Sequence, residues 1–164
     1  MEAIRIENAT PDDQKQLEET FQHFKDKTVM RKRAECYLFH NNTVLAKDGE
    51  HIIGKVLWYV KENPHDGLVE LEELYVLEEY RRKGVGSELI KFSINAVQKH
   101  FKSLGIEPRR IYLFTNENNL GARNLYENFG FKHIANLGHL HSDDENDLFY
   151  ILDLKKKNDL SKNE

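Results

Sequence analysis

The sequence is poor in cysteine and has no long hydrophobic run. A single cysteine among 164 residues excludes an internal disulfide framework, so a reducing cytoplasm is the simplest compartment to expect. No apolar run approaches the length of a membrane span, and residues 3–8 predict a strand rather than a signal peptide. Linkers, repeats and low-complexity segments are also missing. We therefore expect one domain over residues 1–155, followed by a disordered polar tail at 156–164.

A strong excess of either charge is missing too. Acidic residues outnumber lysine and arginine by 28 to 24, which gives a formal net charge of −4. This balance argues against a general nucleic-acid binder and is compatible with a cationic substrate. The expected partners are small molecules, with no nucleic acid and no membrane.

The most informative stretch is residues 70–90, which predicts a strand, a basic turn and a helix. Gly84 and Gly86 allow the backbone to approach a ligand closely. The N–H groups that open the following helix have no intrahelical partner and lie at the positive end of its dipole. The residues Arg81, Arg82 and Lys83 add positive charge. The turn is therefore a predicted pyrophosphate-binding site.

Two common nucleotide motifs do not fit this turn. The dinucleotide fingerprint requires a third glycine where this chain has Leu89, and the Gly-Lys-Ser/Thr of a P-loop is missing. The pattern that fits is Arg-x-x-Gly-x-Gly, formed by Arg81, Gly84 and Gly86. An ordinary basic loop between a strand and a helix is the alternative interpretation.

A second pattern follows the apolar segment 110–115 and the turn 116–119. It runs through a predicted helix at 120–129 and consists of Asn119, Ala122, Tyr126, Gly130 and Phe131. The two patterns, in this order, resemble the two signatures of the GNAT acetyltransferase superfamily. The resemblance covers roughly residues 3–154.

The resemblance implies an α/β fold with the element order β-α-α-β-β-β-α-β-α-β-β. The expected sheet is mixed, mostly antiparallel, with about seven strands, splayed between strands four and five and covered by helices on both faces. Besides the elements of residues 70–90, the sequence predicts helices near 11–25, 28–37 and 120–129, and strands near 3–8, 43–47, 52–61, 110–115, 131–137 and 147–154.

The resemblance also implies acetyl-CoA as co-substrate, with no metal. The pantetheine arm would insert between the splayed strands, where the Val76 N–H would polarise the thioester carbonyl. Tyr126 would protonate the departing thiolate, and Asn119 would contact the pantetheine. The expected cofactor-binding residues are Leu74, Tyr75, Val76, Arg81, Arg82, Lys83, Gly84, Val85, Gly86, Ser87, Asn119, Ala122 and Tyr126.

Tyr126 has a second interpretation. Ala122, Leu125 and Phe129 share helical spacing with it, which is typical of a core aromatic residue. The family pattern favours the catalytic role.

The candidate general bases are the glutamates of the strand predicted at the start of residues 70–90. Glu72 and Glu73 lead, with Glu70 behind them, and a bulge in the strand would re-aim either leading glutamate. A carboxylate here would accept the amine proton or bind the cationic amine. A solvated strand face is the alternative for each glutamate.

The acceptor is predicted less sharply. Residues 71–76 and 80–91 resemble diamine and polyamine N-acetyltransferases of the spermidine/spermine type, in which an acidic residue at the position of Glu72 contacts the amine. Ribosomal-protein N-terminal acetyltransferases have a catalytic glutamate where this chain has Phe114. We predict transfer to a small cationic amine. The alternatives are a protein or peptide acetyltransferase acting on lysine or an N-terminus, and a non-catalytic acyl-CoA sensor. A homodimer is a further expectation.

Two features lie outside both patterns. The acidic loop 139–147 is expected to border the acceptor site, and its His139-x-His141 offers a metal site as an alternative to a solvated hairpin. Cys36 would be a candidate acyl carrier, but it lacks an evident base partner, which favours a structural role.

Overall fold

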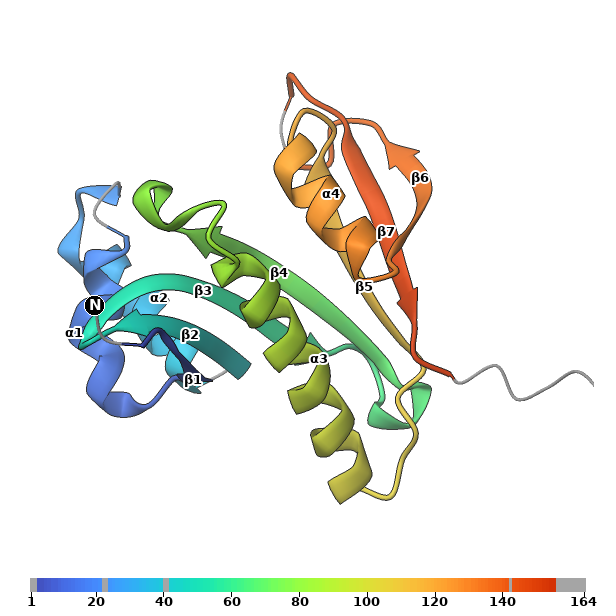
Figure 1. Cartoon of the computed structure of the whole chain (residues 1–164), viewed down its shortest axis with the longest axis horizontal. Helices are drawn as coiled ribbons and strands as arrows, with labels where there is room; N and C mark the ends of the chain where they lie inside the picture. Colours follow the sequence, from blue (N-terminus) through green and yellow to red (C-terminus); the bar gives the residue numbers. More distant parts are fainter. Residues whose placement is uncertain (1–2, 22–23, 40–41, 142, 156–164) are drawn as a thin grey trace, which may run out of the picture. The chain divides into compact units, whose positions relative to one another are not determined.

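The computed structural model describes residues 3–21, 24–39, 42–141 and 143–155 (Figure 1). Within them seven strands form one sheet in the order β1-β2-β3-β4-β5-β7-β6. The strands are β1 (Arg5–Asn8), β2 (Asn42–Asp48), β3 (His51–Val60), β4 (Leu68–Val76), β5 (Arg110–Asn116), β6 (Lys132–Leu137) and β7 (Asp147–Asp153). The α-helices are α1 (Gln14–Glu19), α2 (Lys27–Phe39), α3 (Val85–Ser103) and α4 (Leu120–Asn128). The element order agrees with the predicted one, and the tail predicted at 156–164 lies outside the described residues.

The chain divides into two compact units. The first comprises Met1–Tyr59 and Leu71–Ala96, and the second comprises Val60–Glu70 and Val97–Glu164. The boundaries cut β3, β4 and α3. The single domain expected over residues 1–155 stays a prediction.

In the first unit, helices cover both faces of the strands. Leu45 of β2 lies opposite Lys55 of β3, and Leu45 and Leu57 pack with α1 and α2 in one hydrophobic cluster. The opposite face is marked by Gly54, because a Cβ there would lie 2.9 Å from the Tyr75 carbonyl oxygen and 3.2 Å from the Leu89 side chain of α3. Glycine at this position therefore lets β4 and α3 approach β3 closely.

The first helical segment is shorter than expected. Instead of one helix near 11–25, a 3₁₀ turn (Pro11–Asp13) leads into α1, which ends at Glu19. The Thr20 hydroxyl donates to the Leu17 carbonyl over 2.7 Å, so the side chain caps carbonyl groups that the helix leaves unpaired. The second helix, by contrast, is longer than predicted and runs over thirteen residues, from Lys27 to Phe39.

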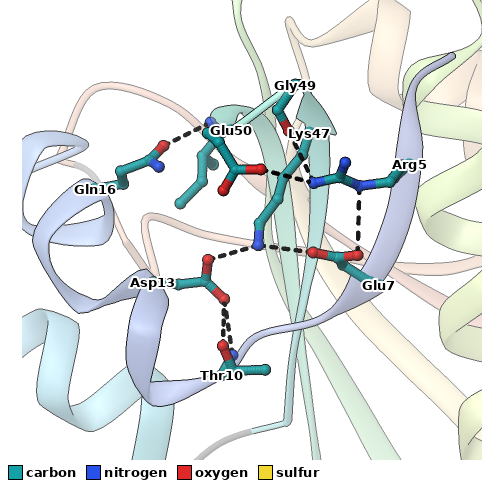
Figure 2. Close-up of polar contacts among 9 residues, drawn as sticks. Arg5, Glu7, Thr10, Asp13, Gln16, Lys47, Gly49 and Glu50 are labelled. Carbon is teal, nitrogen blue, oxygen red and sulfur yellow. Dashed lines mark hydrogen bonds and ion pairs between the residues drawn. The ribbon is translucent and has the colours of Figure 1, made fainter. Parts of the chain in front are cut away.

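An ion network, buried at Lys47 and Asp13, joins β1, β2 and the 3₁₀ turn (Figure 2). Lys47 Nζ lies 2.6 Å from Asp13 Oδ1 and 2.7 Å from Glu7 Oε1, while Asp13 Oδ2 accepts from the Thr10 backbone N–H over 2.8 Å. Burial acts to raise the pKa of Asp13, but the Lys47 hydrogen bond, the Thr10 bonds and the Lys47 charge outweigh it and lower that pKa. Burial likewise acts to lower the pKa of Lys47, but bonds and charges from Asp13 and Glu7 raise it. Each charge is thus compensated.

The second unit is built on β5 and β7. These strands pair antiparallel from Arg110↔Asp153 to Asn116↔Asp147, and β6 pairs with the other edge of β7. The start of β4 pairs parallel with β5 over three positions, Leu68↔Arg110, Val69↔Ile111 and Glu70↔Tyr112. The predicted splay of β4 from β5 beyond this ladder depends on how the two units are placed, and it stays a prediction.

None of the helices in the described part of the chain combines the length and the apolarity that crossing a membrane requires.

Candidate active site

The strand that carries the predicted base is irregular at one residue. Glu73 has φ +49°, in the left-handed region that β-strand residues other than glycine rarely adopt. This irregularity lies at one of the two glutamates that a bulge was expected to re-aim. Strain of this kind persists only where the surrounding structure holds the residue in place.

A pocket of about 310 Å³ lies beside this residue, wholly within the first unit. Its walls come from the end of α1, from α2, β3 and β4, and its lining residues are Thr20, Phe21, Arg33, Lys55, Glu73, Leu74 and Tyr75. Three of these, Glu73, Leu74 and Tyr75, are among the predicted site residues. The pocket holds two cationic side chains against one carboxylate.

Lys55 is the most unusual residue of the pocket. Its side chain is 6% exposed, and Nζ lies 3.9 Å from the centre of the Phe21 ring and 4.5 Å from that of Tyr37. Burial lowers the pKa of Lys55 to about 8; the charge of Arg33 adds to this effect, and that of Glu73 opposes it. Burial, helped by Glu73, also raises the pKa of Tyr37, so its hydroxyl stays protonated.

Glu73 lies between the two cations of the pocket. One carboxylate oxygen is 3.7 Å from Arg33 Nη1, and the other is 3.8 Å from Lys55 Nζ. Arg33 in turn stacks on Phe24, with its guanidinium carbon 4.4 Å from the ring centre. Of the other candidate glutamates, Glu72 is half-buried. Glu70 is buried in an ion pair with Lys61 Nζ at 2.8 Å, which favours a structural role for it.

The predicted phosphate turn has the backbone form that the sequence suggests. Gly84 has φ +86°, and no atom outside its chain neighbours would lie within 4 Å of a Cβ added there. Arg82 has φ +59°. The helix α3 begins at Val85, and the Glu88 N–H already donates to the Gly84 carbonyl over 3.1 Å. The N–H groups of the first turn are thereby directed to the turn before the helix.

Two side chains tie this turn to the strands. Arg81 Nε donates to the Val76 carbonyl over 2.9 Å, and the Tyr80 hydroxyl donates to Asp48 Oδ2 over 2.8 Å. Arg81 thus anchors the turn to the end of β4, a contact that the motif alone does not predict. Lys83 lies with Nζ 5.4 Å from the Tyr80 ring.

The second unit carries the other predicted residues. Asn119 is the N-cap of α4, because its Oδ1 accepts from the Ala122 N–H over 3.1 Å. Tyr126 is buried among aromatic rings, with ring centres 5.8 Å from Phe131 and 6.3 Å from Tyr150. Burial raises the pKa of Tyr126 to about 12, so its hydroxyl is protonated at neutral pH. A catalytic acid and a tyrosine of the core would both have a raised pKa, so this pKa fits both interpretations of Tyr126.

The loop before β7 is organised by Asp147. Its carboxylate accepts from the backbone N–H groups of Leu140 and His141, each over 3.0 Å, and lies 3.0 Å from His141 Nδ1. Burial acts to raise the pKa of Asp147, but the bonds from His141 and Leu140 lower it. Among the described residues no three His, Cys, Asp or Glu side chains are grouped as a metal site requires. Phe114, which stands where the ribosomal-protein N-terminal acetyltransferases have a catalytic glutamate, stacks on Phe149 with ring centres 5.1 Å apart.

Sequence reasoning missed four residues of the pocket: Thr20, Phe21, Arg33 and Lys55. A detectable signal existed for Lys55, because it interrupts the apolar run 52–58 of a strand predicted to be buried. Arg33 gave none, since it is one of many charged residues on a helix of mixed polarity. Cys36 is exposed on the same helix.

Comparison with known proteins adds a family match, two relatives similar in sequence and a solved structure similar in fold. The family model described as acetyltransferase (GNAT) family matches residues 2–131. An N-alpha-acetyltransferase of Sulfurisphaera tokodaii is 30% identical over 104 residues, and a spermine/spermidine N(1)-acetyltransferase of Bacillus subtilis is 35% identical over 71 residues. These matches cover 56% and 43% of this chain.

The chain spans little more than half of these relatives at most, 59% of the first and 43% of the second. Among solved structures, a Salmonella typhimurium protein with its cofactor acetyl-CoA superposes with a TM-score of 0.72, covering 94% of this chain and 95% of that one. At 16% identity this likeness concerns the fold.

Proposed function

Because this chain belongs to the acetyltransferase (GNAT) family, we propose that it transfers the acetyl group of acetyl-CoA to a primary amine by direct attack in a ternary complex. The family match over residues 2–131 carries the proposal. The turn at 81–87 supports it, because the open space at Gly84 and the start of α3 suit a pyrophosphate. Acetyl-CoA would supply the thioester, and no step requires a metal.

The chemistry divides among residues of this chain. The amine nitrogen attacks the thioester carbonyl carbon, the C–S bond breaks, and the thiolate takes a proton from Tyr126. The nitrogen releases its second proton as the amide forms, and a proton from solvent restores the Tyr126 hydroxyl. The Val76 N–H faces the charge that develops on the carbonyl oxygen. A free alkyl amine titrates near ~10.4, so it must lose a proton before it attacks, and Glu72 or Glu73 receives that proton directly or through water.

The acceptor has two candidate classes, each favoured by a relative. The Bacillus subtilis relative is named for spermine and spermidine, which favours a small polyamine or diamine. The Sulfurisphaera tokodaii relative is named an N-alpha-acetyltransferase, which favours a peptide N-terminus. A cytoplasmic location and a homodimer are further parts of the proposal.

The proposal is tested by acetyl-CoA-dependent release of CoA thiol with a panel of spermidine, short diamines, aminoalkanoates and peptides with free N-termini. Turnover of any of these amines supports it. Tight binding of acetyl-CoA with no turnover of any amine would instead support a non-catalytic acyl-CoA sensor.

Tyr126→Phe tests the acid. We expect it to bind acetyl-CoA as the wild type does and to lose about 10²-fold or more in kcat, because the thiolate then leaves unprotonated. Tyr150→Phe is the matched control, since it removes another buried tyrosine hydroxyl of the same unit, one that donates to Glu127 over 2.9 Å. Equal kcat values for the two variants would remove Tyr126 from the mechanism.

A further inference from the structure

The lining of the pocket beside Glu73 carries more cationic than anionic side chains. It holds Arg33 and Lys55 against one carboxylate, Glu73, which leaves an excess of one positive charge. Like charges brought together in a partly desolvated cavity repel each other. A second ammonium group of a diamine would therefore meet repulsion here, whereas an anionic group would meet attraction.

Lys55 has capacity for such an anion. An ammonium has three donors, yet the contacts of Nζ are a 3.5 Å approach to Thr20 Oγ1, a 3.8 Å approach to Glu73 and two aromatic faces. Charge-assisted N–H···O bonds measure about 2.7–2.9 Å. Among the described residues, no carboxylate lies at that distance from this ammonium, although only 6% of its side chain is exposed.

Arg33 and Glu73 complete the arrangement. The guanidinium of Arg33 is held by the Phe24 ring, and its distance of 3.7 Å from Glu73 is also longer than a hydrogen bond. A carboxylate that enters the pocket can thus accept from Lys55 and Arg33 without displacing a strong internal pair. Glu73, which also interacts with the Tyr37 hydroxyl, is the one acid of the lining that can receive the ammonium end of the same ligand.

We infer that this pocket binds an acceptor that carries a carboxylate as well as its primary amine, with Lys55 and Arg33 holding the carboxylate. The inference rests on the proposed function, because it names the class of amine that this site takes. Leu74 and Tyr75 line both the pocket and the predicted path of the pantetheine arm. A ligand in the pocket therefore places its amine next to the predicted acyl group.

The carboxylate has two sources, a free amino acid or aminoalkanoate and the acidic side chain of a peptide with a free N-terminus. Two pairs of compounds, each pair differing at one group, distinguish these two sources. The small-molecule pair is 5-aminopentanoate and 1,5-diaminopentane. The peptide pair begins with Asp or with Asn and is otherwise identical, with an amidated C-terminus.

Binding is measured by calorimetry on the full chain in the presence of CoA, so that the result does not depend on turnover. We expect the carboxylate-bearing member of at least one pair to bind about tenfold or more tightly than its partner. In turnover assays with acetyl-CoA the same member should have the higher kcat/KM.

Lys55→Met should reduce this preference about tenfold or more, and Arg33→Gln should reduce it less, since Arg33 is 44% exposed. Arg31→Gln is the matched control, because Arg31 lies on the same helix, pairs with Glu35 and does not line the pocket. Circular dichroism and the affinity for CoA establish that each variant is folded.

The outcomes separate the two proposals. Tighter binding of the carboxylate member without turnover would support the pocket and contradict the proposed function. Turnover that favours the diamine, or a preference for the carboxylate that survives Lys55→Met, would overturn the inference and leave the acetyltransferase proposal intact. No binding of any of the four compounds would overturn the inference as well.

Discussion

Two buried lysines on neighbouring strands of the first unit show how differently one residue type is used. Lys47 of β2 and Lys55 of β3 have side chains that are 7% and 6% exposed. Lys47 meets carboxylates at 2.6 and 2.7 Å, whereas the nearest carboxylate of Lys55 is at 3.8 Å. The pKa is raised in Lys47 and lowered to about 8 in Lys55. A complete set of partners indicates a structural role, and an incomplete set beside a pocket indicates a binding role.

The largest effect is expected from Lys47→Met. Removing this ammonium leaves the buried carboxylate of Asp13 without its cation, while Glu7 keeps Arg5 at 3.7 Å, and breaking a buried pair in this way costs about 3–5 kcal/mol. Urea unfolding at pH 7 measures the loss. Lys91→Met on α3, where the side chain is 64% exposed, is the control and should change stability by about 0.5 kcal/mol or less. Equal losses in both variants would refute the difference in roles.

Lys55→Met should act in the opposite direction. A pKa that falls from 10.5 to about 8 means that the folded state penalises the charge by about 3 kcal/mol. Methionine removes the penalty but also the contacts of the ammonium with Phe21 and Tyr37, so we expect a gain of about 1–3 kcal/mol at pH 7. The same unfolding experiment measures it, and a loss of stability would show that the pocket does not penalise the lysine.

The pH dependence should separate the two lysines by sign. Between pH 8 and 10.5 the unfolded chain keeps the Lys55 proton that the folded chain releases, so the wild type gains stability relative to Lys55→Met as pH rises. The raised pKa of Lys47 stabilises the fold below pH 10.5, and this contribution is lost as pH rises through the folded value. Urea unfolding of the wild type, Lys55→Met and Lys47→Met from pH 7 to 11 tests both expectations. A common sign for the two lysines would contradict the comparison.

The smallest effect is expected at the rim of the pocket. Arg33 and Glu73 are 44% and 42% exposed and 3.7 Å apart, and such pairs couple by about 0.2–1 kcal/mol. A double-mutant cycle with Arg33→Gln and Glu73→Gln measures this coupling through stability. A coupling of several kcal/mol would mean that the pair closes tightly, which would leave Arg33 unable to receive a ligand.

The fold was largely predictable because its elements carry local signals. The hairpin between β2 and β3 was predicted from Asp48-Gly49, and Gly49 indeed has φ +59°. The helix expected near 11–25 was wrong beyond Glu19, because the Thr20 hydroxyl satisfies a helical carbonyl that a longer helix would have paired. Helical spacing alone does not register this competition between a side chain and the backbone.

The candidate site divides in the same way. The backbone form of the turn at 81–87 was predictable, since Gly84 has a positive φ, and the binding of an anion there stays a prediction. The pocket was not, because its charge results from residues of α2, β3 and β4 that are distant in sequence. The left-handed backbone of Glu73 has no local signal either, since glutamate rarely adopts it.

Gly54 bears on how this sequence can vary over evolution. A side chain at that position would meet the carbonyl oxygen of Tyr75 at 2.9 Å, and a backbone atom cannot rotate aside as the Leu89 side chain can. Replacing Gly54 therefore requires a shift of β4 two residues from Glu73, in the strand that shapes the pocket. Among diverging descendants of this chain, Gly54 can therefore change only together with the course of β4 beside the pocket.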